Sequence, residues 1–394
     1  MWIKFESGKL FVEIGEDMTN NIREVNKIDR HLIAIANQFA SDERVTHIQQ
    51  YGSGNINSTF LVTLDVQPPF ILQRINTAVF CQPELVMNNM CILSNYVSQR
   101  LEQSDLSTID RRWLIPQVLS TSQQQNYWIA EDSSFWRAIS FIDNSQSFDT
   151  IQNIQHGQEI GYGLGMFHHL INDLPVENLA DTLEGFHITP EYLQHYQEVI
   201  ETRKIKSSPE INYCLKFISD RPNLPYILES AKATGKLNLR TIHGDPKINN
   251  IMIDCSTNRA VAMIDLDTVK PGLIHYDIGD CLRSGCNRLG EETECWEEVV
   301  FDPEVAEAIL QGYLSVTKEF LTDNDYKYIY DSIRLLAFEL GLRFFTDYLE
   351  GNIYFNVDSP EHNLKRALIQ FKLTESIETQ EAKIKNIIQK LIFS

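Results

Sequence analysis

The chain has 394 residues, of which 34 are Lys or Arg and 54 are Asp or Glu, and its formal net charge is −20 at pH 7. This charge excludes a nucleic-acid binder that gains its affinity by neutralising phosphates, and it argues against docking on an anionic membrane surface. Hydrophobic residues make up 43% of the chain, as in ordinary globular proteins, and the length allows two domains or lobes.

The seven cysteines are odd in number and form no C-x-x-C pair. This pattern favours reduced thiols in a cytoplasmic protein over a disulfide framework or a zinc site. We expect Cys281 and Cys286 to be core or incidental thiols. The N-terminus contains no apolar run of signal-peptide length, and no stretch approaches 18 uninterrupted apolar residues, so we expect no membrane span.

The first 30 residues are polar and are expected to form an N-terminal extension, followed by a short helix over about 28–41. β-Branched and aromatic residues then predict strands, with one helix after the third strand. The strands are expected at 45–51, 59–65, 70–75, 113–119, 126–131 and 135–142, and the helix at 83–101.

After residue 143 the pattern becomes mainly helical, interrupted by short strands at 239–242, 251–253 and 260–264. Helices are expected at 154–172, 190–204, 209–219, 224–235, 277–288, 303–320, 323–349 and 360–392. We therefore predict an α+β protein with a β-rich N-terminal lobe, residues 1–142, and a larger helical lobe, residues 143–394.

The short strands in the helical lobe carry the most informative residues. Asp245 follows one strand, and Asn250 comes five residues later at the mouth of a hairpin. Asp265 stands at the far end of that hairpin, 20 residues after Asp245, so a tight hairpin brings it close to Asn250. Two oxygen ligands suit Mg²⁺, and a free carboxylate beside them can accept a proton from an attacking hydroxyl. These are the requirements of phosphoryl transfer.

The sequence H-x-D-x-K-x-x-N followed by I-D resembles the catalytic loop and metal-binding aspartate of the protein-kinase-like fold. More narrowly, HGD…NN…IDLD resembles the aminoglycoside phosphotransferase and choline kinase superfamily. The resemblance implies a two-lobed fold with Asp245 as catalytic base and Asn250 and Asp265 as metal ligands. It also implies that Lys247 contacts the transferring phosphate and that His243 braces the loop.

The N-terminal lobe offers a matching glycine loop, Gly52, Ser53, Gly54 and Asn55, between two predicted strands. Glycines let backbone N–H groups approach phosphate oxygens, although such a loop can also be an ordinary hairpin turn. The third strand should present a cation to the nucleotide, and its usual lysine is absent.

Arg74 is the candidate for that cation and Gln73 the alternative, because a one-residue change of register exchanges their faces. Glu84, early in the following helix, is the candidate for the acidic partner. The nucleotide is expected beneath the glycine loop, with its adenine against the connector near 139–143.

A closer likeness connects the chain with N-acetylhexosamine 1-kinases, over about residues 45–355. The matching segments are 52–60, 72–76, 136–137, 265–272, 277–280 and 339–349. Those enzymes phosphorylate the anomeric hydroxyl of GlcNAc or GalNAc with ATP and Mg²⁺. The likeness implies acceptor-binding roles for Asn57, Arg343, Asp347 and Tyr348.

Several of these residues also have ordinary structural interpretations. Asp267 either binds a second metal or holds its loop, and Asp277 and Asp280 could cap the following helix. Arg343 could make only local pairs. His168 and His169 lack metal partners at suitable spacing and are expected to be packing or solvent residues.

We expect a kinase that transfers the ATP γ-phosphoryl group to a sugar hydroxyl of a small-molecule acceptor, as a monomer or homodimer. One alternative is a kinase for an amino alcohol, an aminoglycoside or a specialised metabolite. Residues 291–307, with eight acids and no base, would suit a cationic acceptor. A second alternative is a nucleotide-binding pseudokinase, which the missing lysine favours. A protein kinase is not favoured, because Asp-Phe-Gly and Ala-Pro-Glu are absent.

Overall fold

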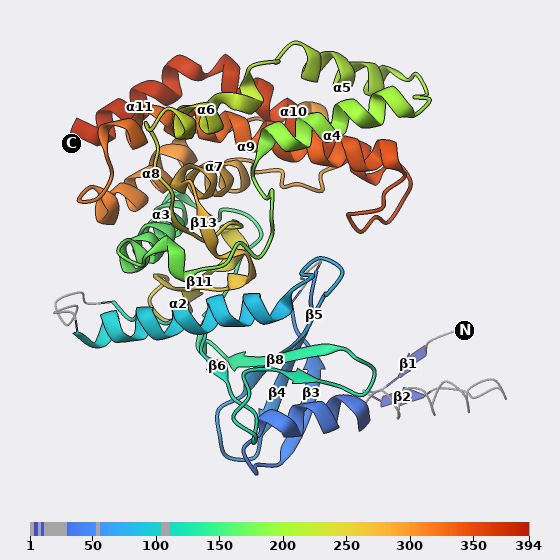
Figure 1. The fold of residues 1–394 in the computed structure, drawn as a ribbon, viewed down its shortest axis with the longest axis vertical. Helices are drawn as coiled ribbons and strands as arrows, with labels where there is room; N and C mark the ends of the chain where they lie inside the picture. The colour runs from blue at the N-terminus through green and yellow to red at the C-terminus, as the bar shows by residue number, and fades with distance from the viewer. Residues whose placement is uncertain (1–3, 7–8, 12–29, 53–55, 104–110, 394) are drawn as a thin grey trace. The chain divides into compact units, whose positions relative to one another are not determined.

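A computed structural model describes residues 4–6, 9–11, 30–52, 56–103 and 111–393 (Figure 1). Its contacts divide the chain into two compact units. The first comprises Met1–Asn76 and Val118–Phe141, and the second comprises Thr77–Gln117 and Ile142–Ser394. The first unit is built on a β-sheet and the second is mainly helical, as the sequence predicted. The division predicted at residue 143 stays a prediction.

The first unit contains a six-stranded antiparallel sheet of order β3-β4-β5-β8-β6, with β7 paired to β8. The strands are β3 (Val45–Gln50), β4 (Ser58–Leu64), β5 (Phe70–Ile75), β6 (Val118–Leu119), β7 (Trp128–Ile129) and β8 (Phe135–Ser140). A separate hairpin pairs β1 (Lys4–Glu6) with β2 (Lys9–Phe11). The strands predicted at 113–119 and 126–131 are confirmed only as two-residue pieces.

One face of this sheet is covered by a helix over residues 30–39. Ile35 and Phe39 of that helix form a buried cluster with Phe70, Leu72 and Trp136 of the sheet. Side chains alternate along a strand, so the odd-numbered residues of β5 point to the opposite face. The alternation therefore places Gln73 and Arg74 on different faces of the sheet.

The second unit contains most of the helices. They are α2 (Pro83–Gln103), α3 (Ile154–Ile171), α4 (Thr189–Thr202), α5 (Pro209–Ser219), α6 (Ile227–Ala233), α7 (Ile274–Gly285), α8 (Pro303–Thr317), α9 (Asp323–Glu350), α10 (His362–Thr379) and α11 (Glu381–Phe393). Short 3₁₀ turns lie at Val176–Asn178, Leu224–Tyr226, Ile248–Asn250, Leu266–Thr268 and Trp296–Glu298.

The single helix predicted over 360–392 is wrong, because the chain breaks at Gln380 into α10 and α11. Its side-chain amide donates to the carbonyl of Phe301, 2.8 Å away. This contact between distant parts of the chain accompanies the break, and sequence periodicity does not report such contacts.

Two small sheets position the loops of the second unit. In one, β10 (Arg240–Ile242) pairs with β13 (Lys270–Gly272), and in the other β11 (Ile251–Asp254) lies between β12 (Ala260–Met263) and β9 (Ser145–Gln146). Strands β9 and β13 were not predicted from the sequence. The loop from β10 to β11 and the turn after β12 carry the residues on which the sequence analysis centred.

Helices α3 and α8 cross at two glycines. A Cβ added to Gly161 would lie 1.8 Å from the carbonyl oxygen of Ile309, and one added to Gly312 would lie 1.9 Å from that of Gln158. The two backbones can approach this closely only because both positions lack a side chain. The crossing fixes α3, whose last turns reach the candidate site.

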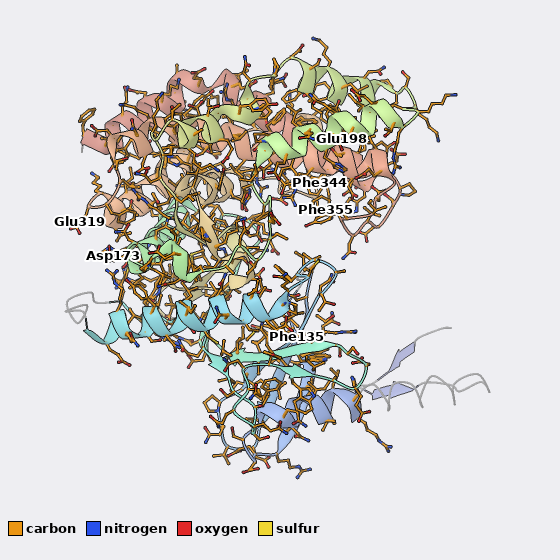
Figure 2. The ribbon with its side chains drawn as sticks, viewed as in Figure 1. Phe135, Asp173, Glu198, Glu319, Phe344 and Phe355 are labelled. Atoms are coloured by element: carbon orange, nitrogen blue, oxygen red, sulfur yellow. The ribbon has the colours of Figure 1, made fainter. Side chains whose placement is uncertain are left out.

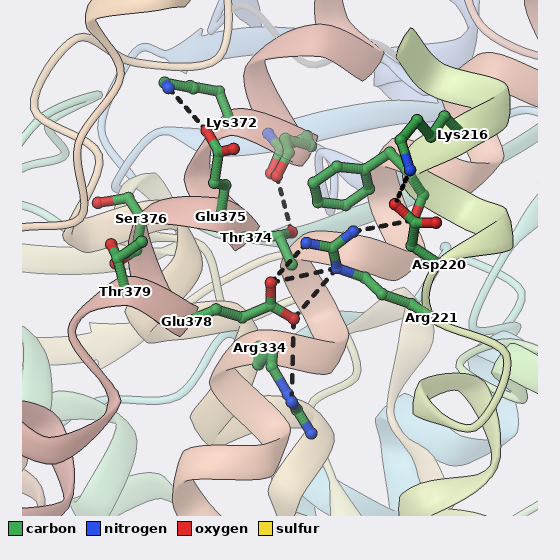
Figure 3. A network of polar contacts seen from close by, with 12 residues as sticks. Lys216, Asp220, Arg221, Arg334, Lys372, Thr374, Glu375, Ser376, Glu378 and Thr379 are labelled. Atoms are coloured by element: carbon green, nitrogen blue, oxygen red, sulfur yellow. Dashed lines mark hydrogen bonds and ion pairs between the residues drawn. The ribbon is translucent and has the colours of Figure 1, made fainter. Parts of the chain in front are cut away.

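A charged cluster joins α5, α9 and α10 within the second unit (Figure 3). Arg221, just after α5, donates to both oxygens of Glu378 at 2.6–3.2 Å, and its guanidinium lies 3.4 Å from the ring centroid of Phe217. Arg334 of α9 also lies 3.8 Å from Glu378. This cluster ties the three helices together.

Candidate active site

The loop after β10 is held by a buried carboxylate, Asp277 of α7. One oxygen of Asp277 accepts from the backbone N–H of His243 at 2.7 Å, and the other accepts from that of Gly244 at 2.8 Å. His168 Nε2 lies 2.8 Å from the same carboxylate. Burial alone would raise the pKa of Asp277, but the His168 hydrogen bond and the nearby charges outweigh it, and the pKa is lowered.

The expectation that Asp277 caps its helix is therefore wrong. Helix α7 begins at Ile274, four residues earlier than it would if Asp277 were its N-cap, and it has no side-chain cap. His168, which was expected to be a packing or solvent residue, is buried at the end of α3 and bonds to Asp277 and to the hydroxyl of Tyr313.

His243 is fully buried and braces the loop internally. Its Nε2–H donates to the carbonyl of Ile264 at 2.9 Å, and its Nδ1 accepts from the backbone N–H of Asp245 at 3.3 Å. Burial lowers the pKa of His243, so the ring is neutral and uses one nitrogen as donor and the other as acceptor. These contacts agree with the bracing role that was expected.

Asp245 is the partly exposed carboxylate of the loop, with 27% of its side-chain surface accessible. Its Oδ2 lies 3.0 Å from Nζ of Lys247, two residues later. Burial opposes ionisation, but Lys247 and nearby charges outweigh it and lower the pKa of Asp245, so this group is a carboxylate at neutral pH. The same pair raises the pKa of Lys247.

Asn250 and Asp265 lie together at the mouth of the hairpin, as its spacing predicted. The backbone N–H of Ile264 donates to the carbonyl of Asn250 at 2.9 Å, which places Asp265 one residue beyond this pair. Asn250 Nδ2 donates to the carbonyl of Asp245 at 2.7 Å and leaves Oδ1 as the acceptor atom of the amide.

Asp265 is exposed and adopts a left-handed backbone conformation, with φ 62° and ψ 56°. A non-glycine residue in this conformation is uncommon, and such strain concentrates at functional sites. Asp267, two residues on, is buried, and its carbonyl accepts from the Thr182 hydroxyl at 3.1 Å.

A second group of charges surrounds Asp245. Arg283 of α7 is buried and contacts Asp280, 2.8 Å away, and Glu291. Burial raises the pKa of Asp280, and the charge of Asp245 adds to this effect. The Oδ2 atom of Asp280 is buried and has no hydrogen-bond partner within the described part of the chain. Asp280 therefore belongs to a charged network and does not cap α7.

Arg343 lies half-buried among four aromatic rings. Its guanidinium is 5.2 Å from the ring centroid of Phe186, 4.9 Å from Tyr192, 5.8 Å from Tyr354 and 5.4 Å from Phe355. We call these four residues the aromatic box. Over residues 30–52, 56–103 and 111–393, Arg343 has no hydrogen bond or ion pair. The charges of Tyr192, Tyr354, Glu339 and Asp245 outweigh its burial and raise its pKa.

Asp347 supports the loop that carries two of these rings. Its carboxylate accepts from the backbone N–H groups of residues 353–355 at 2.8–3.0 Å and from Asn363 Nδ2 at 2.8 Å. Figure 2 shows Phe355 beside Phe344, and their centroids are 4.6 Å apart. Tyr348 is half-buried, and burial raises its pKa, helped by a hydrogen bond with Glu361. The acceptor-binding roles of Asp347 and Tyr348 stay predictions.

The remaining predicted residues lie elsewhere. Gly52 has a positive φ of 75°, whereas Ser53, Gly54 and Asn55 lie outside the described residues. In the first unit Asn57 Oδ1 accepts from the backbone N–H of Asn76 at 2.9 Å. In the second unit Glu84 is exposed in the first turn of α2.

Gln73 and Arg74 of β5 have different surroundings. Gln73 Oε1 accepts from Nε and Nη2 of Arg137 at 2.9 and 2.7 Å, while its Nε2 donates to Thr59. Arg137 is 1% exposed, whereas Arg74 is exposed at the end of the strand. The buried cation of this sheet is therefore Arg137, which the sequence analysis did not single out.

His187 and Glu339 are a further pair that sequence reasoning missed. His187 Nε2 donates to the carbonyl of Gly244 at 2.7 Å, and its Nδ1 lies 2.8 Å from Glu339 of α9. The two residues are 152 positions apart, so no motif or periodicity could connect them.

The acidic segment 291–307 is largely neutralised by its own chain. Five of its eight acids make ion pairs: Glu291 with Arg283, Glu292 with Arg366, Glu294 with Lys365, Asp302 with Arg288, and Glu307 with Lys390. The segment therefore offers fewer free charges to a cation than its composition indicated.

Comparison with solved structures shows a kinase-like fold. An aminoglycoside phosphotransferase from Alicyclobacillus acidocaldarius has a TM-score of 0.60 and 15% identity, covering 91% of this chain and 96% of its own. A choline kinase from Cryptosporidium parvum has a TM-score of 0.54 and 16% identity, covering 88% and 93%. An amicoumacin kinase in complex with AMP-PNP and Ca²⁺ has a TM-score of 0.56 and 14% identity, covering 93% and 96%.

Residues 47–324 match the phosphotransferase enzyme family (APH), and the chain belongs to that family. Among the residues that the structure describes, no helix is long and apolar enough to cross a membrane. Within the same residues, no group of three or more His, Cys, Asp and Glu side chains could hold a metal ion.

Proposed function

We propose that this phosphotransferase is a small-molecule kinase that moves the γ-phosphoryl group of ATP to an acceptor hydroxyl. The main support for this proposal comes from Asp245. It is a partly exposed carboxylate, ionised at neutral pH, on a loop whose backbone is fixed by Asp277 and Asn250. Such a group can orient an attacking hydroxyl and accept its proton. Lys247, beside it, can offset charge on the transferring phosphate.

The oxygen atoms of Asn250 and Asp265 fit a hard divalent cation such as Mg²⁺, with Asp267 as a further candidate. A magnesium ion is usually held by one or two carboxylates and completes its shell with water and substrate phosphate. When bound, the ion would neutralise charge on the phosphates.

For the nucleotide phosphates we propose the glycine loop, residues 52–55, together with the sheet face that carries Gln73 and Arg137. The opposite face, to which Arg74 belongs, is covered by the helix over residues 30–39. Arg137 would then supply the positive charge for which a strand-three lysine is expected. Glu84 stays a candidate for the acidic partner on α2.

For the acceptor we propose a neutral sugar, with an anomeric hydroxyl of an N-acetylhexosamine as first choice. Arg343 supports this choice, because a half-buried guanidinium near Asp245 would repel an ammonium group and can donate hydrogen bonds to sugar oxygens. An aromatic box lined with Phe and Tyr would otherwise suit a quaternary ammonium ligand. In this protein the chain's own cation fills it. Asn57, Asp347 and Tyr348 would support the same acceptor.

The second candidate acceptor is an amine-bearing alcohol. Two observations favour it: the unpartnered Oδ2 of Asp280, and the aminoglycoside and choline kinases among the similar structures. The ion pairs within residues 291–307 weaken it, because they leave fewer acids for a cation.

The test is an ATP-consumption assay with a panel of acceptors: GlcNAc, GalNAc, glucose, choline, ethanolamine, 1-amino-2-propanol and an aminoglycoside. Turnover with a reducing sugar, with ³¹P NMR locating phosphate at C1, is the expected result. Turnover with amines and none with any reducing sugar would replace the sugar assignment by the second candidate. ATP binding without turnover on any acceptor of the panel would count against both candidates.

A further inference from the structure

His187 occupies a constrained position just before α4. Its backbone is left-handed, with φ 67°, and its side chain is 4% exposed. The ring stacks on Tyr276 of α7 at a centroid distance of 5.2 Å and lies 4.0 Å from the ring of Phe186. A positive φ is uncommon for a non-glycine residue, and such a conformation persists where the surrounding contacts hold it.

The two ring nitrogens of His187 have distinct partners. Nε2 lies 2.7 Å from the carbonyl oxygen of Gly244, which can only accept, so Nε2 carries a proton. Nδ1 lies 2.8 Å from Glu339 Oε1, and Glu339 Oε2 accepts from the Thr189 hydroxyl at 2.6 Å. Because a carboxylate can only accept a hydrogen bond, Nδ1 also carries a proton. The pair is therefore an imidazolium and a carboxylate, both buried.

The contact places His187 against the backbone that precedes Asp245. Asp277 takes the N–H groups of His243 and Gly244, while His187 takes the carbonyl of Gly244. That carbonyl belongs to the peptide group whose nitrogen is the N–H of Asp245. Gly244 is thus held from two elements: α7 accepts from its N–H, and the segment before α4 donates to its carbonyl, which belongs to the peptide leading into Asp245.

Helix α9 connects this contact with the acceptor side of the site. Glu339, Arg343 and Asp347 recur every four residues and therefore share one face of the helix. The first holds His187, the second lies in the aromatic box, and the third anchors the loop at 353–355.

We propose that His187 is a positioning residue that fixes the backbone of Asp245 and couples the catalytic loop to the acceptor-facing side of α9. The proposal rests on the proposed function of Asp245. In this arrangement the imidazolium stays protonated, Glu339 stays ionised, and the Gly244 carbonyl keeps its donor. Loss of the Nε2 donor would free the peptide before Asp245 and misalign the base.

The electrostatic surroundings support this arrangement. Burial alone would lower the pKa of His187, but the charge and hydrogen bond of Glu339, with the charge of Asp280, outweigh it and raise the pKa. The other groups near the pair are Arg343 on α9, Tyr276 on α7 and Tyr192 on α4. Deprotonation should therefore occur only as the pH rises through this raised pKa.

The kinetic test compares His187→Leu with His195→Leu, because leucine has no group that can donate to the Gly244 carbonyl. His195, on α4, pairs with Glu350 of α9 but is 52% exposed. With the acceptor found in the panel, and with ATP hydrolysis to water as a second probe, kcat of H187L should fall about 10²-fold. The KM values should change less than about threefold, because binding groups are untouched. H195L should match wild type.

Glu339→Gln provides the conservative rescue. The glutamine can donate to a neutral His187 Nδ1 and accept from Thr189, so Nε2–H still reaches Gly244. This variant should keep most of kcat but lose the fall in kcat that we expect of wild type as the pH rises through the raised pKa of His187. Glu339→Ala, which removes the partner, should lose kcat as H187L does.

Two outcomes overturn the proposal. One is an H187L protein, folded by circular dichroism, whose kcat equals that of wild type. The other is ¹⁵N NMR of the wild-type imidazole at pH 7 that shows an unprotonated ring nitrogen for His187. The NMR measurement needs no turnover, so it reports the protonation of His187 even if H187L does not fold. Absence of any wild-type turnover would instead count against the proposed function.

Discussion

Asp245 and Lys247 neutralise each other across 3.0 Å in the structure, so the proposed base and the proposed phosphate-binding cation share one ion pair. Asp245→Asn keeps the size of the side chain but removes its ability to accept a proton. We expect turnover to fall about 10²- to 10⁴-fold, with an unchanged circular dichroism spectrum. Asp173→Asn, at an exposed pair with Arg100, is the matched control and should keep full activity. Activity retained in D245N would remove Asp245 from the mechanism.

Gly244 has φ 88°, and an added Cβ would lie 2.6 Å from the carbonyl oxygen of Thr268. Gly235 has φ 70° but open space around its Cβ position, so a substitution there measures the cost of the backbone conformation without a steric clash. Gly235→Ala should cost about 1–2 kcal/mol of unfolding free energy. Gly244→Ala should cost more and also lower kcat, because the clash displaces the loop. Urea denaturation and steady-state kinetics measure both, and equal effects of the two variants would contradict the clash.

At the scale of single residues, the sequence could predict which residues lie together only where they belong to one continuous motif. Asp245, Asn250 and Asp265 come together because a hairpin connects them, and hairpin geometry follows from local spacing. Asp277 was assigned the wrong role, because its true partners are backbone groups 33 and 34 residues earlier. The His187–Glu339 pair and the Gln73–Arg137 pair depend on tertiary contacts and on strand register, which one sequence does not reveal.

At the scale of elements, the sheet of the first unit places Arg74 and Arg137 on opposite faces. The sequence alone could not show which of them is the better candidate for binding the nucleotide phosphates. Arg137→Met should raise the KM for ATP about tenfold, the effect expected for one charge-assisted hydrogen bond. Arg74→Met, on the face covered by the helix over 30–39, should change the KM for ATP by less than about twofold. Initial rates at varied ATP measure both. A larger effect of Arg74→Met would return the phosphate-binding role to that residue.

The close crossing of α3 and α8 leads to a second prediction at the scale of elements. Gly312→Ala would place a methyl group 1.9 Å from the backbone of α3, so the helices must separate, at a cost of about 1–3 kcal/mol or more. Gly157→Ala, where the nearest atom is Ala308 Cβ at 3.3 Å, is the control and should be nearly neutral. Guanidinium denaturation gives both free energies. Equal stability of the two variants would show that the crossing tolerates separation.

Sequence periodicity predicted most helices to within a few residues, because their apolar faces pack against one another in the second unit. It failed for the last helix, where the side chain of Gln380 bonds to a distant backbone carbonyl. It also missed β9 and β13, whose two or three residues are too short to show any alternation.

For the whole molecule, buried neutral histidines make stability depend on pH. Burial lowers the pKa of His156, His243 and His275 below the ordinary value of 6.5. Below about pH 6.5 the unfolded chain therefore binds more protons at these sites than the folded chain does. The free energy of unfolding should fall as the pH decreases from 7 towards 5, as urea melts would show.

His275→Gln is the variant that tests this origin. His275 is 1% exposed and bonds through Nε2 to the carbonyl of Asp325 at 2.9 Å, a contact that a glutamine amide can replace. The variant should have a shallower loss of stability between pH 7 and 5 than wild type. His187, whose pKa is raised, contributes in the opposite sense, because its stabilisation is complete below pH 6.5 and is lost as the pH rises through the raised pKa. An identical pH slope in H275Q would assign the loss of stability to other groups.

The net charge of −20 is also unevenly distributed. Residues 236–290 contain seven bases and six acids, whereas residues 291–307 contain eight acids and no base. Five of the eight acids of the second segment pair with basic residues on α7, just after α7, on α10 or on α11. The acidity is therefore compatible with the binding of an anionic nucleotide by a nearly neutral catalytic segment.

The aromatic box around Arg343 has a consequence for how acceptor choice could change during evolution. Four rings already stand at distances suited to a cation, and a single side chain of the same protein fills the space. Replacement of Arg343 by a small residue would empty that space and leave a binding site for a quaternary amine. Members of one family could therefore exchange neutral for positively charged acceptors by a single mutational step, while the loop that performs the transfer stays the same.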